Sequence, residues 1–285
     1  MTRVQASGKS LPLKQDGTMN EITSEIMSEI TIDINSDIGE LPDAIANGTE
    51  EKIMRLLTSA NIACGGHAGD EQTMEITVGL AKKLGVGIGA HPGYPDRENF
   101  GRTEMEMMPE ALEASVREQI AALQKVAKRH GVPVVHVKPH GALYHAANNS
   151  KAAAEAISRA ALACDPKLIM VGQSGSNALR WYAGMGLETV AEAFADRAYE
   201  SDGTLRNRKL PGALMQPAER AAEQGVGIAA RGEIITIDGQ RLAVAAQTIC
   251  IHSDTPGAPD IARALREHLQ AAGVKVAPLR AGAGK

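Results

Sequence analysis

The chain has 285 residues, of which 44% are hydrophobic and only 2% aromatic, and its formal net charge at pH 7 is -4. This length and apolar content suit one large α/β domain, whereas the acidic balance and the scarcity of aromatic rings argue against a nucleic-acid partner. No apolar run reaches the length of a membrane span, and the first thirty residues lack the apolar centre of a signal peptide. The three widely spaced cysteines indicate reduced thiols, packed mainly as small core side chains, and a cytoplasmic location.

Residues 1–30 are polar and show no sustained hydrophobic period, so we expect a poorly ordered extension there, followed by one catalytic domain over residues 31–285. In that domain, short apolar runs alternate with helix-length stretches, which is the pattern of repeated βα units. Seven main strands are predicted, at residues 31–35, 59–63, 86–90, 134–138, 168–171, 188–193 and 243–251. Helices are predicted at residues 50–57, 70–84, 109–130, 151–164, 176–185, 216–224 and 259–271. Asp238-Gly239, between the apolar runs 234–237 and 242–246, predicts a β-hairpin before the last strand.

Polar and apolar residues alternate along three of these strands. Apolar residues on one face suit packing against outer helices, so the polar residues are expected to face the barrel axis. These inward residues are Asp33, Asn35 and Asp37, then His136, Lys138 and His140, and finally Thr248, Cys250 and His252. Because buried polar groups are costly unless they are paired, the pattern implies a hydrogen-bonded network or a bound ion inside the barrel mouth.

Five ionisable or metal-binding side chains fall just past the predicted strands: Asp37, His67, His91, His140 and His252. In a closed parallel barrel the carboxyl ends of all strands meet at one rim, and active sites are built there. The spacing therefore predicts an enzyme with its active site at this rim.

The first two strand-to-helix segments each admit two interpretations. Asp37 can be a metal ligand or a general base, with Glu40 nearby, or it can cap a turn while Glu40 is solvated. In the glycine-rich segment 64–70, the backbone can hold His67 over the mouth and Asp70 begins a helix whose N–H groups can meet an anion. The alternative for this segment is a tight turn with a capping Asp and a hydrogen-bonded His.

The segments after the third and fourth strands carry cationic side chains. Arg97 and Arg102 lie in a charged loop after His91, where they can reach a carboxylate or a phosphate. Lys138 is expected on the inner face; desolvation would lower its pKa and make it a nucleophile, base or anion clamp. The equally weighted alternative is an internal salt bridge with Asp33 or Asp37. Tyr144, on the following helix, can donate a hydrogen bond into the site.

The stretch 196–212 has no apolar period and begins with Asp196 and Arg197. Its composition suits a mobile lid or a protein-contact loop, or else a solvated crossover. The chain contains no Walker A motif, no GxGxxG, no GxSxG nucleophile elbow and no HExxH. A conventional nucleotide cradle is therefore not expected.

Six segments of this chain resemble the LamB/YcsF family, whose members are the A subunits of 5-oxoprolinase. They are IDINSDIGE (32–40), NIACGGHAGD (61–70), GAHPGYPDRENFGR (89–102), HVKPHGALY (136–144), EAFADRAYESDGTL (192–205) and AAQTICIHSD (245–254). The resemblance implies a distorted seven-stranded β/α barrel, TIM-like and of the glycoside hydrolase/deacetylase type. It also implies ATP-dependent opening of 5-oxo-L-proline to L-glutamate together with partner subunits B and C. Two departures are the first thirty residues and Gly66, where the family often has Phe; the smaller residue is expected to loosen packing beside His67.

A lactam is a stable amide, and ATP can activate it by phosphorylating its oxygen. Because no phosphate loop is present, we expect the partner subunits to hold most of the ATP. The residues expected to act in catalysis are Asp37, His67, His91, Lys138 and His140. Those expected to bind substrate are Asn35, Asp70, Arg97, Arg102, Tyr144, Asp196, Arg197 and His252. Asp37, His67 and His91 are the candidate ligands if the site holds a divalent metal.

Two further functions remain open on sequence grounds. One is a stand-alone metal-dependent amidohydrolase or deacetylase built on Asp37, His67 and His91. The other is a non-catalytic protein that binds the lactam and presents it to its partners. Activity with and without subunits B and C, ATP and a chelator distinguishes the three.

Overall fold

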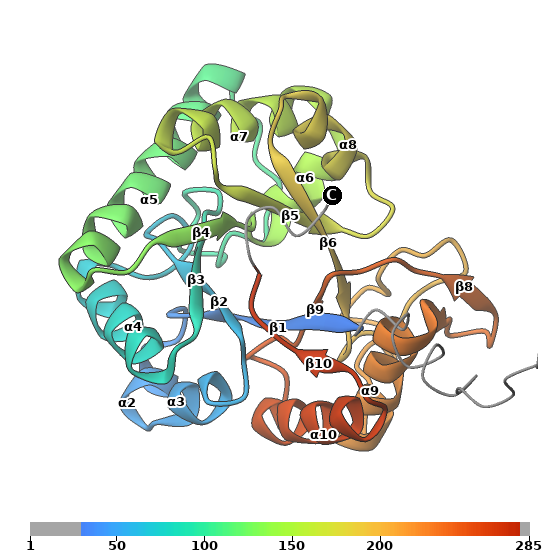
Figure 1. The fold of residues 1–285 in the computed structure, drawn as a ribbon. Coiled ribbons are helices and arrows are strands. Elements are labelled where there is room, and N and C mark those ends of the chain that lie inside the picture. Colours follow the sequence, from blue (N-terminus) through green and yellow to red (C-terminus); the bar gives the residue numbers. More distant parts are fainter. Residues whose placement is uncertain (1–29, 280–285) are drawn as a thin grey trace, which may run out of the picture.

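Seven parallel strands close into a barrel at the centre of the molecule, as the sequence predicted (Figure 1). The computed structural model describes residues 30–279, so the expectation for residues 1–30 falls, apart from Ile30, outside the described residues. Neighbouring strands pair in chain order, and the last strand closes the barrel against the first. The strands are β1 (Thr31–Ile38), β2 (Ser59–Ala63), β3 (Gly87–His91), β4 (Val134–Val137), β5 (Ile169–Gln173), β6 (Glu188–Phe194) and β9 (Thr248–Cys250).

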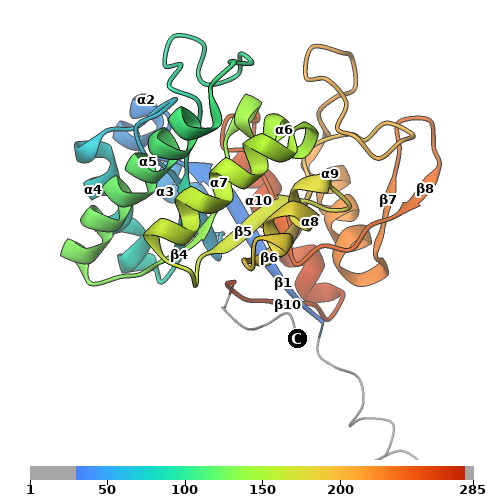
Figure 2. The same cartoon turned by 90° about the horizontal axis from the view of Figure 1, so that it is seen from above.

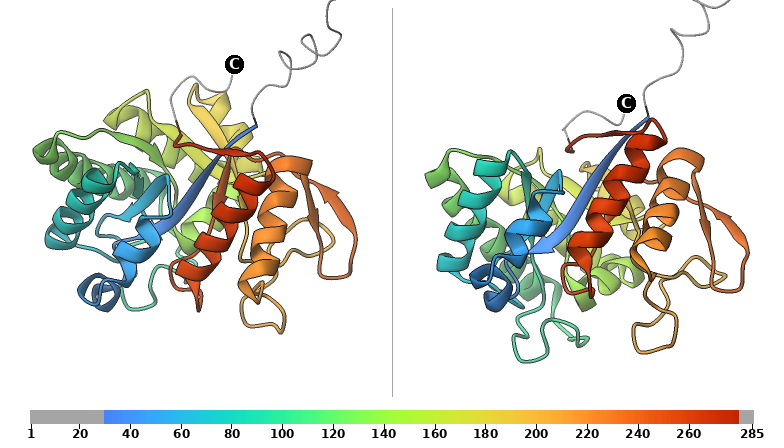
Figure 3. Two further views of the ribbon diagram at one scale, coloured as in Figure 1. Left: turned by 60° about the horizontal axis from the view of Figure 1, so that its bottom comes forward. Right: turned by 90° about the horizontal axis from the view of Figure 1, so that it is seen from below.

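Helices surround this barrel on the outside (Figures 1 and 3). They are α2 (Pro42–Ala46), α3 (Thr49–Met54), α4 (Glu71–Leu84), α5 (Pro109–His130), α6 (Gly141–Asn149), α7 (Lys151–Cys164), α8 (Asn177–Gly184), α9 (Ala218–Val226) and α10 (Ala258–Ala271). A π-helical turn, η1 (Gly227–Arg231), continues α9. None of the helices within residues 30–279 is long and apolar enough to cross a membrane.

Local sequence sets the ends of the two helices that follow β2 and β3. Asp70 accepts a hydrogen bond from the backbone N–H of Thr73 at 2.8 Å and so caps α4, while Pro109 stands in the first turn of α5. Gly85 and Gly131 end these helices with φ of 71° and 69°, a region that glycine adopts without steric strain.

The two faces of the strands differ in polarity as predicted. Ile34, Val137 and Ile249 are fully buried in the apolar core. On the opposite face, polar side chains bond to one another across the barrel; Asp33, for example, accepts a hydrogen bond from the Thr248 hydroxyl at 2.5 Å. The expected polar network inside the barrel is therefore confirmed, and it fixes the orientation of the inward side chains near the rim.

The predicted hairpin is present as β7 (Glu233–Ile235) and β8 (Arg241–Ala243). The last barrel strand, β9, is shorter than the predicted 243–251, because Ala243 ends the hairpin strand β8 and residues 244–247 only connect it to β9. A short strand that the sequence analysis did not predict, β10 (Lys275–Val276), extends the sheet beside β1.

Two long segments project from the same side of the barrel, one between β3 and α5 and one between β6 and α9 (Figure 2). Each follows the carboxyl end of a strand, so both rise from the rim where the active site was expected. The second contains residues 196–212 and is tied by single antiparallel bridges between Arg197 and Leu214 and between Tyr199 and Leu205.

Candidate active site

A cavity of about 370 Å³ opens at the carboxyl ends of the strands. Four of the five residues predicted to act in catalysis line it: Asp37, His91, Lys138 and His140. The fifth, His67, is buried beneath it and stacks on His140, with ring centroids 3.6 Å apart. The other lining residues are Arg102, Pro139, Gly141, Ala142, Tyr144, His145, Phe194, Arg197, Leu205, Arg206, Asn207, Arg208 and His252.

Lys138 lies at the floor of this cavity, held between two carboxylates. Its Nζ is 3.0 Å from Oδ1 of Asp37 and 2.9 Å from Oε1 of Glu192, and 3.1 Å from Sγ of Cys250. Burial acts to lower the pKa of Lys138, but the carboxylates of Asp37 and Glu192 outweigh it and raise the pKa well above its usual value. The prediction that the pKa of Lys138 is lowered is therefore wrong, and so is the prediction that this lysine is a nucleophile or a base. The alternative interpretation, an internal salt bridge with Asp37, is the one that the structure shows.

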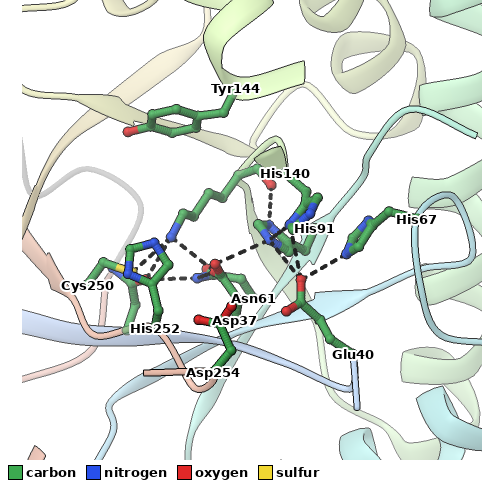
Figure 4. A network of polar contacts seen from close by, with 12 residues as sticks. Asp37, Glu40, Asn61, His67, His91, His140, Tyr144, Cys250, His252 and Asp254 are labelled. Atoms are coloured by element: carbon green, nitrogen blue, oxygen red, sulfur yellow. Dashed lines mark hydrogen bonds and ion pairs between the residues drawn. The ribbon is translucent and has the colours of Figure 1, made fainter. Parts of the chain in front are cut away.

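Asp37 stands on β1 itself rather than in the loop after it, and it is held in the ionised state. Its Oδ1 accepts hydrogen bonds from Lys138 and from Nδ2 of Asn61 at 2.8 Å, and its Oδ2 lies 3.5 Å from Nε2 of His91. Burial acts to raise the pKa of Asp37, but the neighbouring charges of His91 and Lys138 lower it well below the usual range. Asp37 is thus a fixed negative charge at the cavity wall (Figure 4).

Glu40 gathers three histidines beside this pair, as Figure 4 shows. Its Oε1 lies 2.9 Å from Nε2 of His67, 3.0 Å from Nδ1 of His140 and 3.6 Å from Nε2 of His91. Burial acts to raise the pKa of Glu40, but the bonds to His140 and His67 lower it far below its usual value. Burial also lowers the pKa of His67 to about 4. Glu40 is therefore a buried carboxylate at the centre of a histidine cluster, not the solvated side chain of the alternative interpretation.

Asp196 and His252 form a second bonded pair at the cavity wall. Nδ1 of His252 lies 3.1 Å from both carboxylate oxygens of Asp196, and Oδ2 of Asp196 also accepts a hydrogen bond from the Thr255 hydroxyl at 2.5 Å. The His252 ring stacks on Phe194, with centroids 5.4 Å apart and planes inclined by 13°. Because Nδ1 donates to Asp196, the opposite nitrogen, Nε2, is free to exchange a proton with a bound molecule.

Arginines gather at the mouth of the cavity around a single carboxylate. Arg102 donates to Oδ2 of Asp254 at 2.6 Å, and Arg208 bonds to both oxygens of the same carboxylate at 2.9 Å. Arg197 also lines the cavity, and its Nη2 donates to the backbone carbonyl of Arg206 at 2.6 Å. Arg206 lines the cavity as well and pairs with Glu200 at 2.8 Å. Four guanidinium groups against these two carboxylates leave the mouth positively charged, which suits an anionic molecule.

Two of the residues predicted to bind substrate lie away from the cavity. Asp70 is exposed and caps α4, and Arg97 donates to the backbone carbonyls of Gly65 and Gly69 at 3.1 and 2.8 Å. Arg97 and Asp70 thus brace the glycine-rich segment that carries His67 and do not line the cavity.

Two others reach the site from below or beside it. Asn35 lies deeper in the barrel, where its Nδ2 donates to Oε1 of Glu192 at 3.0 Å and to the Thr248 hydroxyl at 2.7 Å. Tyr144 lines the cavity and donates to Oε2 of Glu192 at 3.1 Å.

Gly66 does not loosen the packing beside His67. A Cβ at this position would lie 2.3 Å from Oε1 of Gln119 and 2.6 Å from the carbonyl oxygen of Gly93. Gln119 of α5 occupies that space and bonds to both the N–H and the carbonyl of Gly93, at 3.0 and 2.9 Å. The expectation of looser packing is therefore wrong, because a polar side chain from a distant helix fills the gap.

Several site residues were not singled out from the sequence. The sequence does contain a pattern that indicates Glu192. The alternation of polar and apolar residues that was used for three strands, when extended to residues 188–194, places Glu192 on the same face as Phe194. Cys250, by contrast, was predicted to face the barrel axis as a small side chain, and its sulfur lies there in contact with the Lys138 ammonium. Arg208 and Asp254 carry no local pattern, because their pairing joins segments 46 residues apart.

Comparison with known proteins identifies the family. A 5-oxoprolinase A subunit of Chloroflexus aggregans is 47% identical over 246 residues, which cover 86% of this chain and 98% of that protein. The one of Methylococcus capsulatus is 46% identical over 249 residues, covering 87% and 96%. The crystal structure of a lactam utilization protein from Thermus thermophilus superposes with a TM-score of 0.82 at 43% identity, over 87% of this chain and 100% of that one. The LamB/YcsF family profile matches residues 32–284, and the chain belongs to the LamB/YcsF family.

Proposed function

We propose that this chain is the A subunit of an ATP-dependent 5-oxoprolinase, which opens the lactam of 5-oxo-L-proline to L-glutamate. The names and full-length similarity of the two relatives support this activity. Within the molecule, the observation that best supports this activity is the cavity, which has Lys138 at its floor and arginines at its mouth. A small cyclic amide with a carboxylate needs both a cation beside its carbonyl oxygen and a second cationic group for the carboxylate.

The two ends of such a substrate match the two ends of the cavity. The carboxylate is recognised at the mouth by Arg197 and Arg208, with Arg102 beside them, because a guanidinium pairs well with a carboxylate. The lactam oxygen then points toward Lys138, whose ammonium is kept charged by Asp37 and Glu192. A fixed positive charge in a buried site stabilises the negative charge that develops on this oxygen.

The chemistry proceeds by activation and then hydrolysis. Transfer of the γ-phosphoryl group of ATP to the lactam oxygen releases ADP and makes the carbonyl carbon a better electrophile. Water adds to that carbon, the C–N bond breaks and the nitrogen takes a proton, which leaves an acyl phosphate. A second water hydrolyses the acyl phosphate to L-glutamate and phosphate.

His252 is positioned to accept the proton of the attacking water. Its Nδ1 is bonded to Asp196, an arrangement that orients the ring and stabilises the imidazolium once it forms. Asp37, whose carboxylate lies within 4.8 Å of a ring nitrogen of His252, fixes the Lys138 ammonium and orients water at the cavity wall. His67, His91 and His140 complete the catalytic set beside Asp37.

ATP is bound mainly by partner subunits B and C in this proposal. The chain has no glycine-rich phosphate loop, and positioning of the nucleotide dominates phosphoryl-transfer catalysis. The segment 196–212 rises from the rim beside the cavity and is our candidate docking surface for these partners (Figure 2). The three cysteines are free thiols, which fits a cytoplasmic enzyme.

The test is glutamate release from 5-oxoproline by the purified chain, alone and mixed with subunits B and C, with and without ATP. We expect release only in the complete mixture with ATP, and its loss when Lys138 is replaced by Met. Full-rate glutamate release by the isolated chain would contradict the proposal that subunits B and C bind the ATP. ATP-independent hydrolysis of simple amides, abolished by a chelator, would instead support a stand-alone metal hydrolase. A complete mixture that is unaffected by Lys138→Met would indicate a non-catalytic binding protein.

A further inference from the structure

We propose that the floor of the cavity binds a divalent transition-metal ion with the ligand preference of Zn²⁺, held by Nε2 of His91, Nδ1 of His140 and a carboxylate oxygen of Glu40. This inference concerns the chain by itself and does not depend on the lactam being the substrate. It rests on the hydrogen bonds that fix the two histidine rings, on the separation of the three ligand atoms, and on the charge around them.

Backbone carbonyls determine which nitrogen of each ring carries the proton. Nδ1 of His91 lies 2.7 Å from the carbonyl oxygen of Lys138, and Nε2 of His140 lies 2.9 Å from the carbonyl oxygen of Phe100. A carbonyl oxygen only accepts hydrogen bonds, so both of these nitrogens must donate. In the neutral rings, Nε2 of His91 and Nδ1 of His140 are therefore left with lone pairs.

These two lone pairs face each other and a carboxylate. Nδ1 of His140 and Nε2 of His91 are 3.0 Å apart, and Oε1 of Glu40 is 3.0 Å from the first and 3.6 Å from the second. With neutral rings, no hydrogen lies between any two of the three atoms. Three electron-rich atoms buried this close together repel one another unless a cation lies among them. Without a metal that cation is a proton, because the carboxylates of Asp37 and Glu40 outweigh burial and raise the pKa of His91, and a divalent ion would take its place.

The spacing of these atoms matches a metal site. A tetrahedral ion with bonds of about 2.0–2.1 Å holds its ligands roughly 3.3 Å apart, and the three separations here are 3.0, 3.0 and 3.6 Å. Histidines that bind metals usually donate their other ring N–H to a carbonyl or a carboxylate, as both His91 and His140 do. The rings are thus already oriented for an ion.

The charges nearby also favour a cation. Asp37, Glu40 and Glu192 bring three carboxyl groups into the region, whereas Lys138, which bonds to Asp37 and Glu192, is the one ammonium paired with them in residues 30–279. With neutral histidines the formal charge of this group is -2. Burying excess negative charge is costly, and a divalent cation would neutralise it.

The residues around the three proposed ligands show where the fourth coordination position lies and which residues are not ligands. His67 donates from Nε2 to Glu40, so its Nδ1 is a lone pair, consistent with the missing hydrogen-bond partner of that atom. His91 and His140 line the cavity whereas Glu40 lies beneath it, so the fourth coordination position faces the cavity, as in catalytic zinc sites with three protein ligands. The sequence analysis named Asp37, His67 and His91 as the candidate metal ligands. In residues 30–279 the ligand atoms of these three do not form a group that lies within 4.8 Å of one another, and the tautomers also favour Glu40, His91 and His140.

The test uses the full-length purified chain stripped with a chelator, and it measures metal binding directly. We expect titration calorimetry with Zn²⁺ to give one bound ion per chain, and Co²⁺ to show the intense visible absorption of a four- or five-coordinate site. The variants Glu40→Gln and His140→Gln should each lower the affinity for Zn²⁺ at least about a hundredfold, since each removes one of three ligands. Bound Zn²⁺ should also raise the Tm of the wild-type chain and not that of the variants.

His145→Ala is the matched control, because His145 lines the same cavity but lies outside the cluster. It should bind Zn²⁺ as the wild type does. If a variant does not fold, as circular dichroism would show, the Co²⁺ spectrum of the wild-type chain still decides the question. The proposal is overturned if the wild type binds no Zn²⁺ or Co²⁺, which would mean that the lone pairs share a proton instead. It is also overturned if folded Glu40→Gln and His140→Gln bind Zn²⁺ as tightly as His145→Ala.

Discussion

Lys138 and Glu192 form an ion pair of 2.9 Å at the floor of the cavity, and both side chains are almost completely shielded from solvent. Lys138 follows β4 and Glu192 lies on β6, so the pair joins two strands that are not adjacent in the barrel. A buried charge that loses its partner is left uncompensated, and this makes the pair a sensitive place to test the site.

Replacing Lys138 by Met should destabilise the fold and remove most of the activity. The carboxylates of Asp37 and Glu192 would then face each other without a cation, which costs about 3–5 kcal/mol of unfolding free energy. We expect glutamate release in the complete mixture to fall at least about a hundredfold, because the charge beside the lactam oxygen is lost. Chemical denaturation and steady-state kinetics measure the two effects. Lys83→Met, at an exposed position, should change neither.

Asp37→Asn should abolish lactam opening while the fold persists. The substitution keeps the shape of the side chain and an oxygen that can accept from Asn61 and Lys138, but it removes the negative charge at the cavity wall. A loss of at least about a hundredfold in kcat is expected if this carboxylate acts in catalysis. Near-normal turnover in the complete mixture would exclude that role. Asp43→Asn, on the exposed side of α2, serves as the control.

His252→Gln should lower kcat with little change in KM. Glutamine can still donate a hydrogen bond to Asp196, but it cannot take a proton from water. We expect kcat to fall by about a hundredfold or more, in the range typical for the removal of a general base. If KM rises instead and kcat is preserved, His252 binds the substrate and does not act as the base.

Arg208→Ala should raise KM for 5-oxoproline about tenfold or more, because it removes one of the guanidinium groups at the mouth of the cavity. The matched comparison is 2-pyrrolidinone, the same lactam ring without a carboxylate. Weak turnover of 2-pyrrolidinone should be equal in the variant and the wild type. An equal loss for both lactams would show that Arg208 supports the structure of the mouth through Asp254 rather than the carboxylate of the substrate.

Asp33 should make the fold less stable as the pH rises from about 4 to 6. Burial raises the pKa of Asp33 from its ordinary value of 3.8 to about 6, against the hydrogen bonds from Thr248, Ser59 and Thr58, and the charge of Glu192 adds to the rise. The folded state therefore holds this proton more tightly than the unfolded chain does. The free energy of unfolding is highest at a pH below the pKa of Asp33 in the unfolded chain, and it falls as the pH rises until the pH exceeds the pKa of Asp33 in the folded state. The difference of about two pH units corresponds to about 3 kcal/mol.

Asp33→Asn removes this titration. Urea denaturation at pH 4 and pH 6 should show a decline in unfolding free energy that is smaller in Asp33→Asn than in the wild type by up to about 3 kcal/mol. Asp43→Asn should decline as the wild type does. Identical declines in Asp33→Asn and the wild type would mean that Asp33 is not protonated in the fold.

The barrel and its functional rim could be predicted because both depend on local patterns. Apolar runs separated by helix-length stretches indicate βα units, and the alternation in residues such as Asp33, Asn35 and Asp37 indicates which face points inward. Strand polarity then places the residue that follows each strand at the same rim. For this reason the sequence by itself places Asp37, His91 and His140 in one site.

What only the tertiary structure decided is how these side chains pair. The pKa of Lys138 depends on Glu192, which comes from a different strand, and two carboxylates reverse the effect of burial that the sequence suggested. The ionised Glu40 depends on His67 and His140 closing around it, and the space at Gly66 is filled by Gln119 from α5. Hydrogen-bonded and ionic contacts act over about 3 Å, whereas sequence periodicity defines only which face and which rim a residue occupies. The chain alone therefore determined the barrel, the rim and most of the residues gathered there, and folding determined their charge states and partners.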